Sequence, residues 1–370
     1  MRVLGIDLGT TNTVAALDDR TLPLSPRDGR GSSLPSVVAF LPNGVTRIGL
    51  AAKRRRWIDS ENTVFSAKRI IGRRFDDAVT QAYRERYPLQ VVEGEGGVPA
   101  FETRAGRLTA VDIAAEMLTA IRDKVTVQPL DFDRAAVTVP AGFGMAQREA
   151  TLAAAEQAGL VGARLVDEAL ATAHAYGRAT NPVSRAGVYD LGGGTFDFSI
   201  VEWKGGEPEL VESQSDLALG GDDIDQVLAE WAADQVLKEW NWDLRNYSEI
   251  YARLVAECEQ AKIRLSFFEE TVVDLSQVDT EGSVPAEGLP ISREILDRIS
   301  EDLVRRTFVT CDGVLAAAGL RPGDLDAVFL AGGSTHLGKV RDGVEAYFAQ
   351  PGRFELEPTE VVALGASWAR

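Results

Sequence analysis

Cysteine and histidine are both scarce in this chain, which contains two of each among its 370 residues. Cys258 and Cys311 have neither the spacing of a zinc site nor that of a close disulfide pair, which favours a reducing compartment. Two histidines are too few for a metal centre with several imidazole ligands. No apolar run reaches the roughly 20 residues that a membrane-spanning helix needs. A strand begins within two residues of the N-terminus, so we expect no signal peptide, no membrane association and a cytoplasmic protein.

Positive charge is also in short supply, because 39 lysines and arginines are outnumbered by 56 aspartates and glutamates, giving a net charge of −17. We therefore expect no nucleic-acid partner and no anionic membrane surface. The basic run Lys53–Trp57 is a local exception, and a solvated helix face is its simplest explanation. The chain is long for a single core, which favours two lobes.

A glycine-rich turn between two strands is the most informative stretch, with the sequence VYDLGGGTFDFSI over residues 188–200. Asp190 is followed by Gly192, Gly193 and Gly194, and apolar residues stand on both sides. Glycine lets backbone N–H groups approach a ligand with no Cβ in the way. Such N–H groups beside a carboxylate suit a phosphate together with a divalent metal.

A second copy of this device lies near the N-terminus, with the sequence LGIDLGTTNTV over residues 4–14. Asp7 precedes Asp190 by 183 residues, close to half of the chain. We therefore expect two similar lobes that clamp one polyphosphate from opposite sides. Two purely structural hairpins are the alternative, but they would not require so many glycines and threonines at their tips.

Strands and helices alternate through both halves, which predicts a mostly parallel or mixed sheet with helices on its faces. Apolar spacing predicts helices over 108–122 and 145–158, with Thr109 as an N-cap. The stretch over 51–75 is basic and its pattern indicates helix. Insertions at corresponding places in the two halves would give four subdomains around one cleft.

Six short motifs in sequence resemble the nucleotide-binding domain of the seventy-kilodalton heat-shock chaperones, the DnaK type. They are GIDLGTTN (5–12), AKRIIG (67–72), VTVP (137–140), DLGGGTFD (190–197), GGDD (220–223) and AGGST (331–335). Their order and spacing match the family from Arg2 to the last residue. The resemblance implies an α/β fold of the actin-like superfold, a two-lobed ATPase with a duplicated ribonuclease-H-like core.

The resemblance also implies domain boundaries. Lobe I would span residues 1–180, with subdomain IB inserted into IA at about 36–108 and a helix at about 355–370 completing the lobe. Lobe II would span residues 181–354, with subdomain IIB inserted into IIA at about 223–304.

Site roles follow from the same resemblance. Asp7 and Asp190 would hold Mg²⁺, largely through its waters. Lys68 would reach the γ-phosphate and orient the attacking water, while Glu168 and Asp197 would position water or metal, with Asp197 as a proton acceptor. The phosphate-binding residues, with Thr195 also acting in catalysis, would be Gly9, Thr10, Thr11, Asn12, Gly192, Gly193, Gly194 and Thr195. The other nucleotide-binding residues would be Gly220, Gly221, Glu259, Lys262, Ser266, Gly332, Gly333 and Ser334.

Some residues depart from the family pattern. They are Ala141 to Met145 after Pro140, Ala169 after Glu168, Asp222, His336 and Thr359. None removes a phosphate or metal group, and most fall in the relay in which Pro140 and Arg148 would form the family's proline switch. The family continues beyond a module of this length into a peptide-binding β-sandwich and a helical lid, and the residues do not decide whether this chain has such a partner.

The resemblance implies a slow ATPase that binds ATP or ADP with Mg²⁺, and K⁺ is a second candidate ion. J-domain co-chaperones, nucleotide-exchange factors and a peptide-binding domain are the partners that the family implies, and we expect a monomer. Two other proteins on the same superfold are alternatives: a sugar-type kinase and a filament-forming, actin-like ATPase. The AKR motif and the helix around Glu259 favour the chaperone type.

Overall fold

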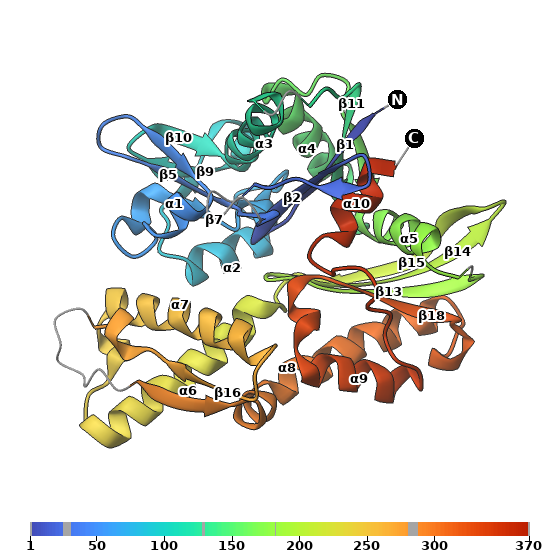
Figure 1. Ribbon diagram of the computed structural model, residues 1–370. Coiled ribbons are helices and arrows are strands. Elements are labelled where there is room, and N and C mark those ends of the chain that lie inside the picture. The colour runs from blue at the N-terminus through green and yellow to red at the C-terminus, as the bar shows by residue number, and fades with distance from the viewer. Residues whose placement is uncertain (1, 25–30, 128–129, 182, 280–287, 369–370) are drawn as a thin grey trace.

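The computed structural model describes residues 2–24, 31–127, 130–181, 183–279 and 288–368. The first half of the chain, blue to green in Figure 1, lies on one side of the molecule, and most of the yellow to red half lies on the other. Residues 280–287 of the predicted IIB insert and 369–370 of the predicted last helix lie outside the described residues.

The sheet of the first half is built on the predicted N-terminal hairpin. Strand β1 (Val3–Leu8) is antiparallel to β2 (Asn12–Leu17) and parallel to β11 (Arg134–Val139), which is parallel to β12 (Arg164–Asp167). Two short strands extend it beyond β2, namely β3 (Arg20–Thr21) and β4 (Ser33–Pro35). The predicted mixed sheet is confirmed.

The sheet of the second half repeats this arrangement. Strand β13 (Arg185–Leu191) is antiparallel to β14 (Phe196–Lys204) and parallel to β18 (Ala327–Ala331), while β15 (Glu207–Asp216) extends the sheet. In the register of the hairpins, Asp7 lies opposite Val14 and Asp190 lies opposite Asp197. Opposite the aspartate, therefore, only the second hairpin provides another carboxylate.

Helices cover both sheets. Those of the first half are α3 (Ala110–Val127), α4 (Met145–Gln157) and α5 (Glu168–Ala179). In the second half α8 (Arg293–Ala317) packs on β14 and β15, and α9 (Gly338–Phe348) packs on α8, while α6 (Gly221–Trp240) packs on α8 and on α7 (Ser248–Leu265). Thr109 accepts a hydrogen bond from the backbone N–H of Asp112 (3.3 Å), as the N-cap prediction requires. Within the described ranges no helix is both long and apolar enough to cross a membrane.

The predicted helix over 51–75 is wrong for most of its length. The region contains α1 (Leu50–Lys53), the strand β7 (Thr63–Phe65) and the 3₁₀ helix η2 (Ala67–Ile70). Strand β7 pairs with β5 (Val37–Phe40), and all three of its residues are buried. A β-branched and aromatic segment gains more from that buried pairing than from continuing a helix.

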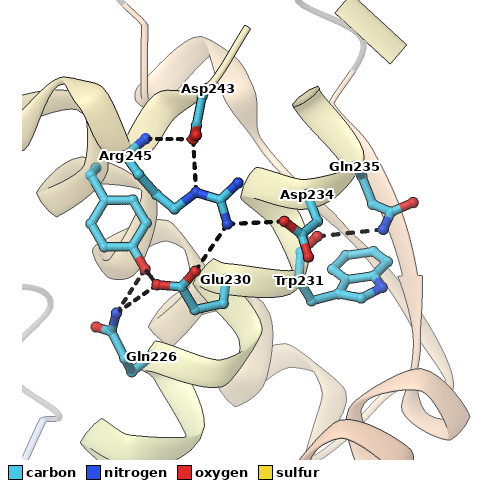
Figure 2. A network of polar contacts seen from close by, with 8 residues as sticks. Gln226, Glu230, Trp231, Asp234, Gln235, Asp243 and Arg245 are labelled. Carbon is cyan, nitrogen blue, oxygen red and sulfur yellow. Dashed lines mark hydrogen bonds and ion pairs between the residues drawn. The ribbon is translucent and has the colours of Figure 1, made fainter. Parts of the chain in front are cut away.

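The remaining elements form smaller units at the outer ends of the two halves. In the first half they are β6 (Thr46–Ile48), α2 (Ala78–Arg86), β8 (Val91–Glu93), β9 (Pro99–Thr103) and β10 (Gly106–Thr109). In the second half β16 (Glu270–Val273) pairs with β17 (Leu289–Ser292). A half-exposed network centred on an arginine joins α6 to the segment before α7: Arg245 forms ion pairs with Glu230, Asp234 and Asp243 (Figure 2).

The last helix, α10 (Val361–Trp368), returns to the first half and packs against β1 and α5 (Figure 1). The backbones of α10 and α5 are so close that glycine is required at Gly365, where a Cβ would overlap the carbonyl group of Ala171. A separate apolar core lies at the junction of the halves, where the rings of Tyr176 and Phe329 stack with centroids 4.4 Å apart. The junction therefore joins the halves by packing as well as by the chain itself.

Candidate functional site

A cavity of about 430 Å³ opens between the two halves, lined by the tips of both hairpins. The predicted site residues that line it are Asp7, Gly9, Thr10, Thr11, Asn12, Lys68, Glu168, Asp190, Gly192, Gly193, Gly194, Thr195, Glu259, Lys262, Ser266, Gly332, Gly333 and Ser334. A second cavity of about 460 Å³, lined by Phe40, Arg104 and Asp112 among others, contains none of the motif residues. The motifs therefore converge on the cavity between the halves.

The two hairpin tips approach each other directly across this cavity. A Cβ at Gly193 would lie 2.7 Å from the Cβ of Thr11, and one at Gly194 would lie 2.9 Å from the Cγ2 of Thr10. The Oγ1 of Thr11 is buried and has no hydrogen-bond partner within the described part of the chain. A buried hydroxyl without a partner is costly, so its position favours a polar ligand such as a phosphate oxygen.

Three predicted residues do not line the cavity. Gly220 and Gly221 lie behind the second hairpin: a Cβ at Gly220 would lie 2.5 Å from the carbonyl oxygen of Gly193, and the N–H of Gly221 donates to the carbonyl of Gly192 (3.0 Å). Their position indicates support of the hairpin rather than contact with a ligand.

Asp197, the third, lines a separate cavity of about 10 Å³ together with Pro140, Glu168 and Asp190. A cavity of this size holds about one water molecule.

Ser334 and Gly332 pack against the hairpin of the second half. The Ser334 hydroxyl donates to the carbonyl of Gly192 (3.0 Å). Gly332 has a φ of 81°, and a Cβ there would lie 2.6 Å from the Oδ1 of Asp190. Glycine is therefore required at this position both by the backbone conformation and by the carboxylate beside it.

Negative charge is concentrated at the inner end of the site. Burial, together with the charge of Glu168, raises the pKa of Asp7 to about 7 and that of Asp197 to about 6. Burial and the neighbouring carboxylates Glu168, Asp197 and Asp7 raise the pKa of Asp190 well above its usual range. These raised values mean that the carboxylates lack sufficient compensating positive charge.

This excess of charge fits a cation held between Asp7 and Asp190. Among the residues that the structure describes, no three histidine, cysteine, aspartate or glutamate side chains converge closely enough to bind a metal directly. Mg²⁺ usually keeps several of its waters and takes only one or two carboxylates, so the donor set is compatible with an ion bound through water.

Lys68 is the cation nearest to this group. Its Nζ lies 2.6 Å from the Oε1 of Glu168, and the two side chains are only 10% and 12% exposed. Burial alone would lower the pKa of Lys68, but Glu168 and Asp7 outweigh it and hold the pKa above its usual value. The lysine is therefore charged, and its ammonium group is bound to Glu168.

The predicted nucleoside-binding residues of α7 are bound to other side chains. The Nζ of Lys262 lies 2.8 Å from both the Oδ1 of Asp225 and the carbonyl oxygen of Gly221. Glu259 accepts hydrogen bonds on both carboxylate oxygens from the Nζ of Lys53, each at 2.6 Å. This pair joins the second half to the first across the mouth of the site.

The pair with Glu259 corrects the interpretation of the run Lys53–Trp57 as a solvated face. The Lys53 side chain is 17% exposed, and the guanidinium of Arg56 lies 3.7 Å from the centre of the Phe65 ring. At least these two residues are used in packing and pairing. Composition could not indicate this, because the partner Glu259 is 206 residues away.

Arg148 links the proposed relay to the site. Its guanidinium donates to the carbonyls of Ala141 (3.3 Å) and Phe143 (2.9 Å) and to Asp167 (2.5 Å), the residue before Glu168. The loop after Pro140 is therefore connected to the strand end that positions Glu168. The role of Pro140 and Arg148 as a switch stays a prediction.

Several lining residues were not predicted as functional. They are Ile263, Phe267, Leu337, Glu357 and Pro358, together with His336 and Thr359, which the sequence marked only as departures from the family. The aromatic pair that directly follows Ser266 was the available signal, since two exposed aromatic residues next to a nucleotide-binding motif are unusual.

The duplicated hairpins, the two matching mixed sheets and the cavity between them that contains the motif residues define the actin-like ATPase fold, as predicted. A family model described as "Hsp70 protein" matches residues 3–369, and the chain belongs to the Hsp70 family of 70 kDa heat-shock proteins. The resemblance drawn from the six motifs is thereby confirmed. Membership supports, in general terms, a chaperone-type ATPase that binds ATP or ADP.

Proposed function

We propose that this chain binds Mg-ATP in the cavity between its halves and hydrolyses it slowly to ADP and phosphate, with closure of the halves as the output. The observation that carries the proposal is the convergence of both hairpin tips, one carboxylate from each half and the Lys68–Glu168 pair on one cavity. Family membership favours this chaperone-type activity over a sugar-type kinase or a filament protein with the same fold.

Each group has a role in this proposal. Bound Mg²⁺ would neutralise part of the phosphate charge, held through its waters by Asp7 and Asp190. Backbone N–H groups and hydroxyls of the two hairpin tips would bind the β- and γ-phosphates, including the unpartnered hydroxyl of Thr11.

Lys68 would stabilise the charge that develops on the γ-phosphate, and Glu168 would orient the attacking water. Lys68 must then divide its ammonium group between Glu168 and the phosphate. Asp197 would take the proton from that water by way of the small cavity that it shares with Glu168, because a carboxylate with a pKa of about 6 is a better base near neutral pH than an ordinary aspartate.

We also propose the setting that the family implies. The chain would act in the cytoplasm as a monomer, with J-domain co-chaperones, a nucleotide-exchange factor and a peptide-binding domain as its partners. K⁺ would be a second ion at the phosphate site. The predicted boundaries of lobes I and II and of subdomains IB and IIB belong to the same proposal.

The experiment compares wild type with Lys68→Ala, measuring Mg-ADP affinity by calorimetry and ATP hydrolysis in single turnover. We expect hydrolysis to fall by about 100-fold or more, as for other groups that stabilise developing charge, while ADP affinity stays within about threefold. Lys204→Ala, at a side chain that is 61% exposed, is the control. Unchanged turnover in Lys68→Ala would contradict the role of this lysine, and wild type without nucleotide binding would contradict the whole proposal.

A further inference from the structure

Asp197 belongs to a row of side chains that crosses the sheet of the second half. In the register of the strands it lies opposite Asp190 on β13 and opposite Ser215 on β15, the strand at the edge of this sheet. Residues directly opposite each other in a sheet project from the same face, so these three side chains are neighbours. The row therefore runs from a proposed metal-binding carboxylate, through the proposed proton acceptor, to a serine that none of the six motifs contains.

The hydroxyl of Ser215 donates a hydrogen bond to the Oδ1 of Asp197. The acceptor is only 9% exposed, and it lines the small cavity that it shares with Glu168. A hydrogen bond to a carboxylate is stronger than one between neutral groups, and little water competes for it at a buried position. The bond therefore restricts the rotation of the carboxylate and leaves its second oxygen to take a proton.

The side chain of Thr195 also forms a hydrogen bond with Asp197. Thr195 lies at the tip of the hairpin and lines the nucleotide cavity, so we expect a bound phosphate to compete for its hydroxyl. Ser215 lines neither that cavity nor the small one. Its bond to Asp197 is therefore the one that does not depend on the nucleotide.

The loop after Pro140 packs over Ser215. A Cβ at Gly142 in this loop would lie 3.2 Å from the Oγ of Ser215, closer than most such contacts. The guanidinium of Arg148 donates hydrogen bonds to two carbonyl groups of the same loop and thereby holds it in place. This close packing leaves the hydroxyl little freedom to turn away from Asp197.

We propose that Ser215 is a positioning residue for hydrolysis, whose hydroxyl holds the Asp197 carboxylate in the orientation that takes a proton from the attacking water. The inference rests on the proposed function and adds a residue that acts through Asp197 without touching nucleotide or metal. As the water oxygen bonds to the γ-phosphorus and the bond to ADP breaks, the water proton goes to Asp197 and Ser215 keeps its own. Loss of the hydroxyl therefore slows hydrolysis and leaves nucleotide binding unchanged.

The test uses Ser215→Ala, with Ser213→Ala as a matched control. Ser213 lies two residues earlier on β15, and its hydroxyl is 2.8 Å from the neutral hydroxyl of Ser199. Single-turnover ATP hydrolysis should fall by roughly 10-fold in Ser215→Ala, a part of the 100-fold or more that a positioned proton acceptor contributes. Mg-ADP affinity, measured by calorimetry, should stay within about twofold of wild type. Ser213→Ala should stay within about twofold in both measurements.

Two further variants distinguish positioning from a general structural role. Ser215→Thr keeps the hydroxyl and should hydrolyse ATP within about threefold of the wild-type rate. Asp197→Asn cannot take the proton and should be slow by itself. Adding Ser215→Ala to Asp197→Asn should change the rate by less than about twofold, because the effects of residues that act as one unit do not add.

Three results would overturn the inference while leaving ATP hydrolysis by this chain intact. They are a wild-type rate in Ser215→Ala, a rate in Ser215→Thr as low as that in Ser215→Ala, and an equal loss from Ser215→Ala with and without Asp197→Asn. A wild-type rate in Asp197→Asn would instead overturn the proposed role of Asp197, and wild type that binds no nucleotide would overturn the proposed function. In both of these cases the inference fails with them.

Discussion

The closeness of the two hairpin tips is decided by single residues, above all Gly193. Its missing Cβ leaves room for Thr11, whose Cβ would otherwise be 2.7 Å away and whose Cγ2 would be 3.0 Å away. Threonine is branched at Cβ and has little rotamer freedom, so the side chain cannot move aside cheaply. One methyl group at this position would therefore push the two halves apart at the point where they would grip a phosphate.

We accordingly predict that Gly193→Ala lowers Mg-ADP affinity by at least about tenfold, since about 1.4 kcal/mol of lost contact is enough for this. Gly192→Ala is the matched control, because a Cβ there would meet only the carbonyl oxygen of Thr195 at an ordinary 3.6 Å. Calorimetric titration of the three proteins checks the prediction. Equal losses in both variants would mean that the whole turn, and not the contact with Thr11, sets the affinity.

The residues that could be predicted are those whose requirement is local. The Asp-Leu-Gly turns placed Asp7 and Asp190 on one cavity because each motif contains its own strand end and glycines. The position of Phe267 in the cavity wall and the Lys53–Glu259 pair were missed, because both depend on residues that are close in space but far apart in the sequence. Asp197 was predicted within its motif, but its separation from the main cavity depends on a strand register that no motif contains.

At the scale of elements, the packing of α10 on α5 shows a second kind of dependence on glycine. A Cβ at Gly365 would overlap the carbonyl of Ala171 and lie 3.0 Å from its Cα, so backbone meets backbone and no side chain can yield. We predict that Gly365→Ala destabilises the protein by about 2–3 kcal/mol, as overpacking of a tight interface does.

A lower midpoint of thermal unfolding would show this loss, with Gly323→Ala as the control. Nothing lies within 4 Å of a Cβ at Gly323, so that variant should unfold near the wild-type temperature. A midpoint for Gly365→Ala equal to that of the control would mean that α10 can move away from α5 at no cost, contrary to its burial in the junction core.

Element types were predictable where one force dominated. The helix predicted over 145–158 is α4, and it is followed by Gly159, whose φ of 77° favours glycine. The segment over 51–75 was predicted wrongly because basic residues mask the short buried strand at Thr63–Phe65, which is stabilised only by its partner β5. Sheet partners of three or four residues leave too little periodicity in the sequence to be recognised.

At the scale of the whole molecule, the two halves are joined across the site by contacts that do not need a ligand. Arg86 forms an ion pair with Asp223 (2.8 Å), and the guanidinium of Arg69 donates to the carbonyl of Leu217. The Lys53–Glu259 pair differs from these in lying beside the cavity mouth, since Glu259 lines the cavity and Lys53 does not. A nucleotide that leaves the site would therefore have to pass this ion pair or break it.

We expect this ion pair to help to hold the two halves together, with a coupling energy that depends on its burial. Its side chains are 17% and 18% exposed and both oxygens are engaged, whereas the Arg305–Asp302 pair on α8 is 76% and 87% exposed. Exposed ion pairs contribute little, because water and salt screen them and ordering the side chains costs entropy. A coupling of about 1 kcal/mol between Lys53 and Glu259 is a reasonable expectation for the more buried pair.

We predict that Lys53→Met speeds the release of a fluorescent ADP analogue by about fivefold, the factor that about 1 kcal/mol corresponds to. Stopped-flow displacement by excess ATP measures it, and Arg305→Met should leave the rate unchanged. Raising the salt concentration should accelerate release less in Lys53→Met than in wild type, because the variant has no ion pair left to screen. If Lys53→Met released the analogue at the wild-type rate at every salt concentration, the halves would be held closed by the hairpin tips and the junction core alone.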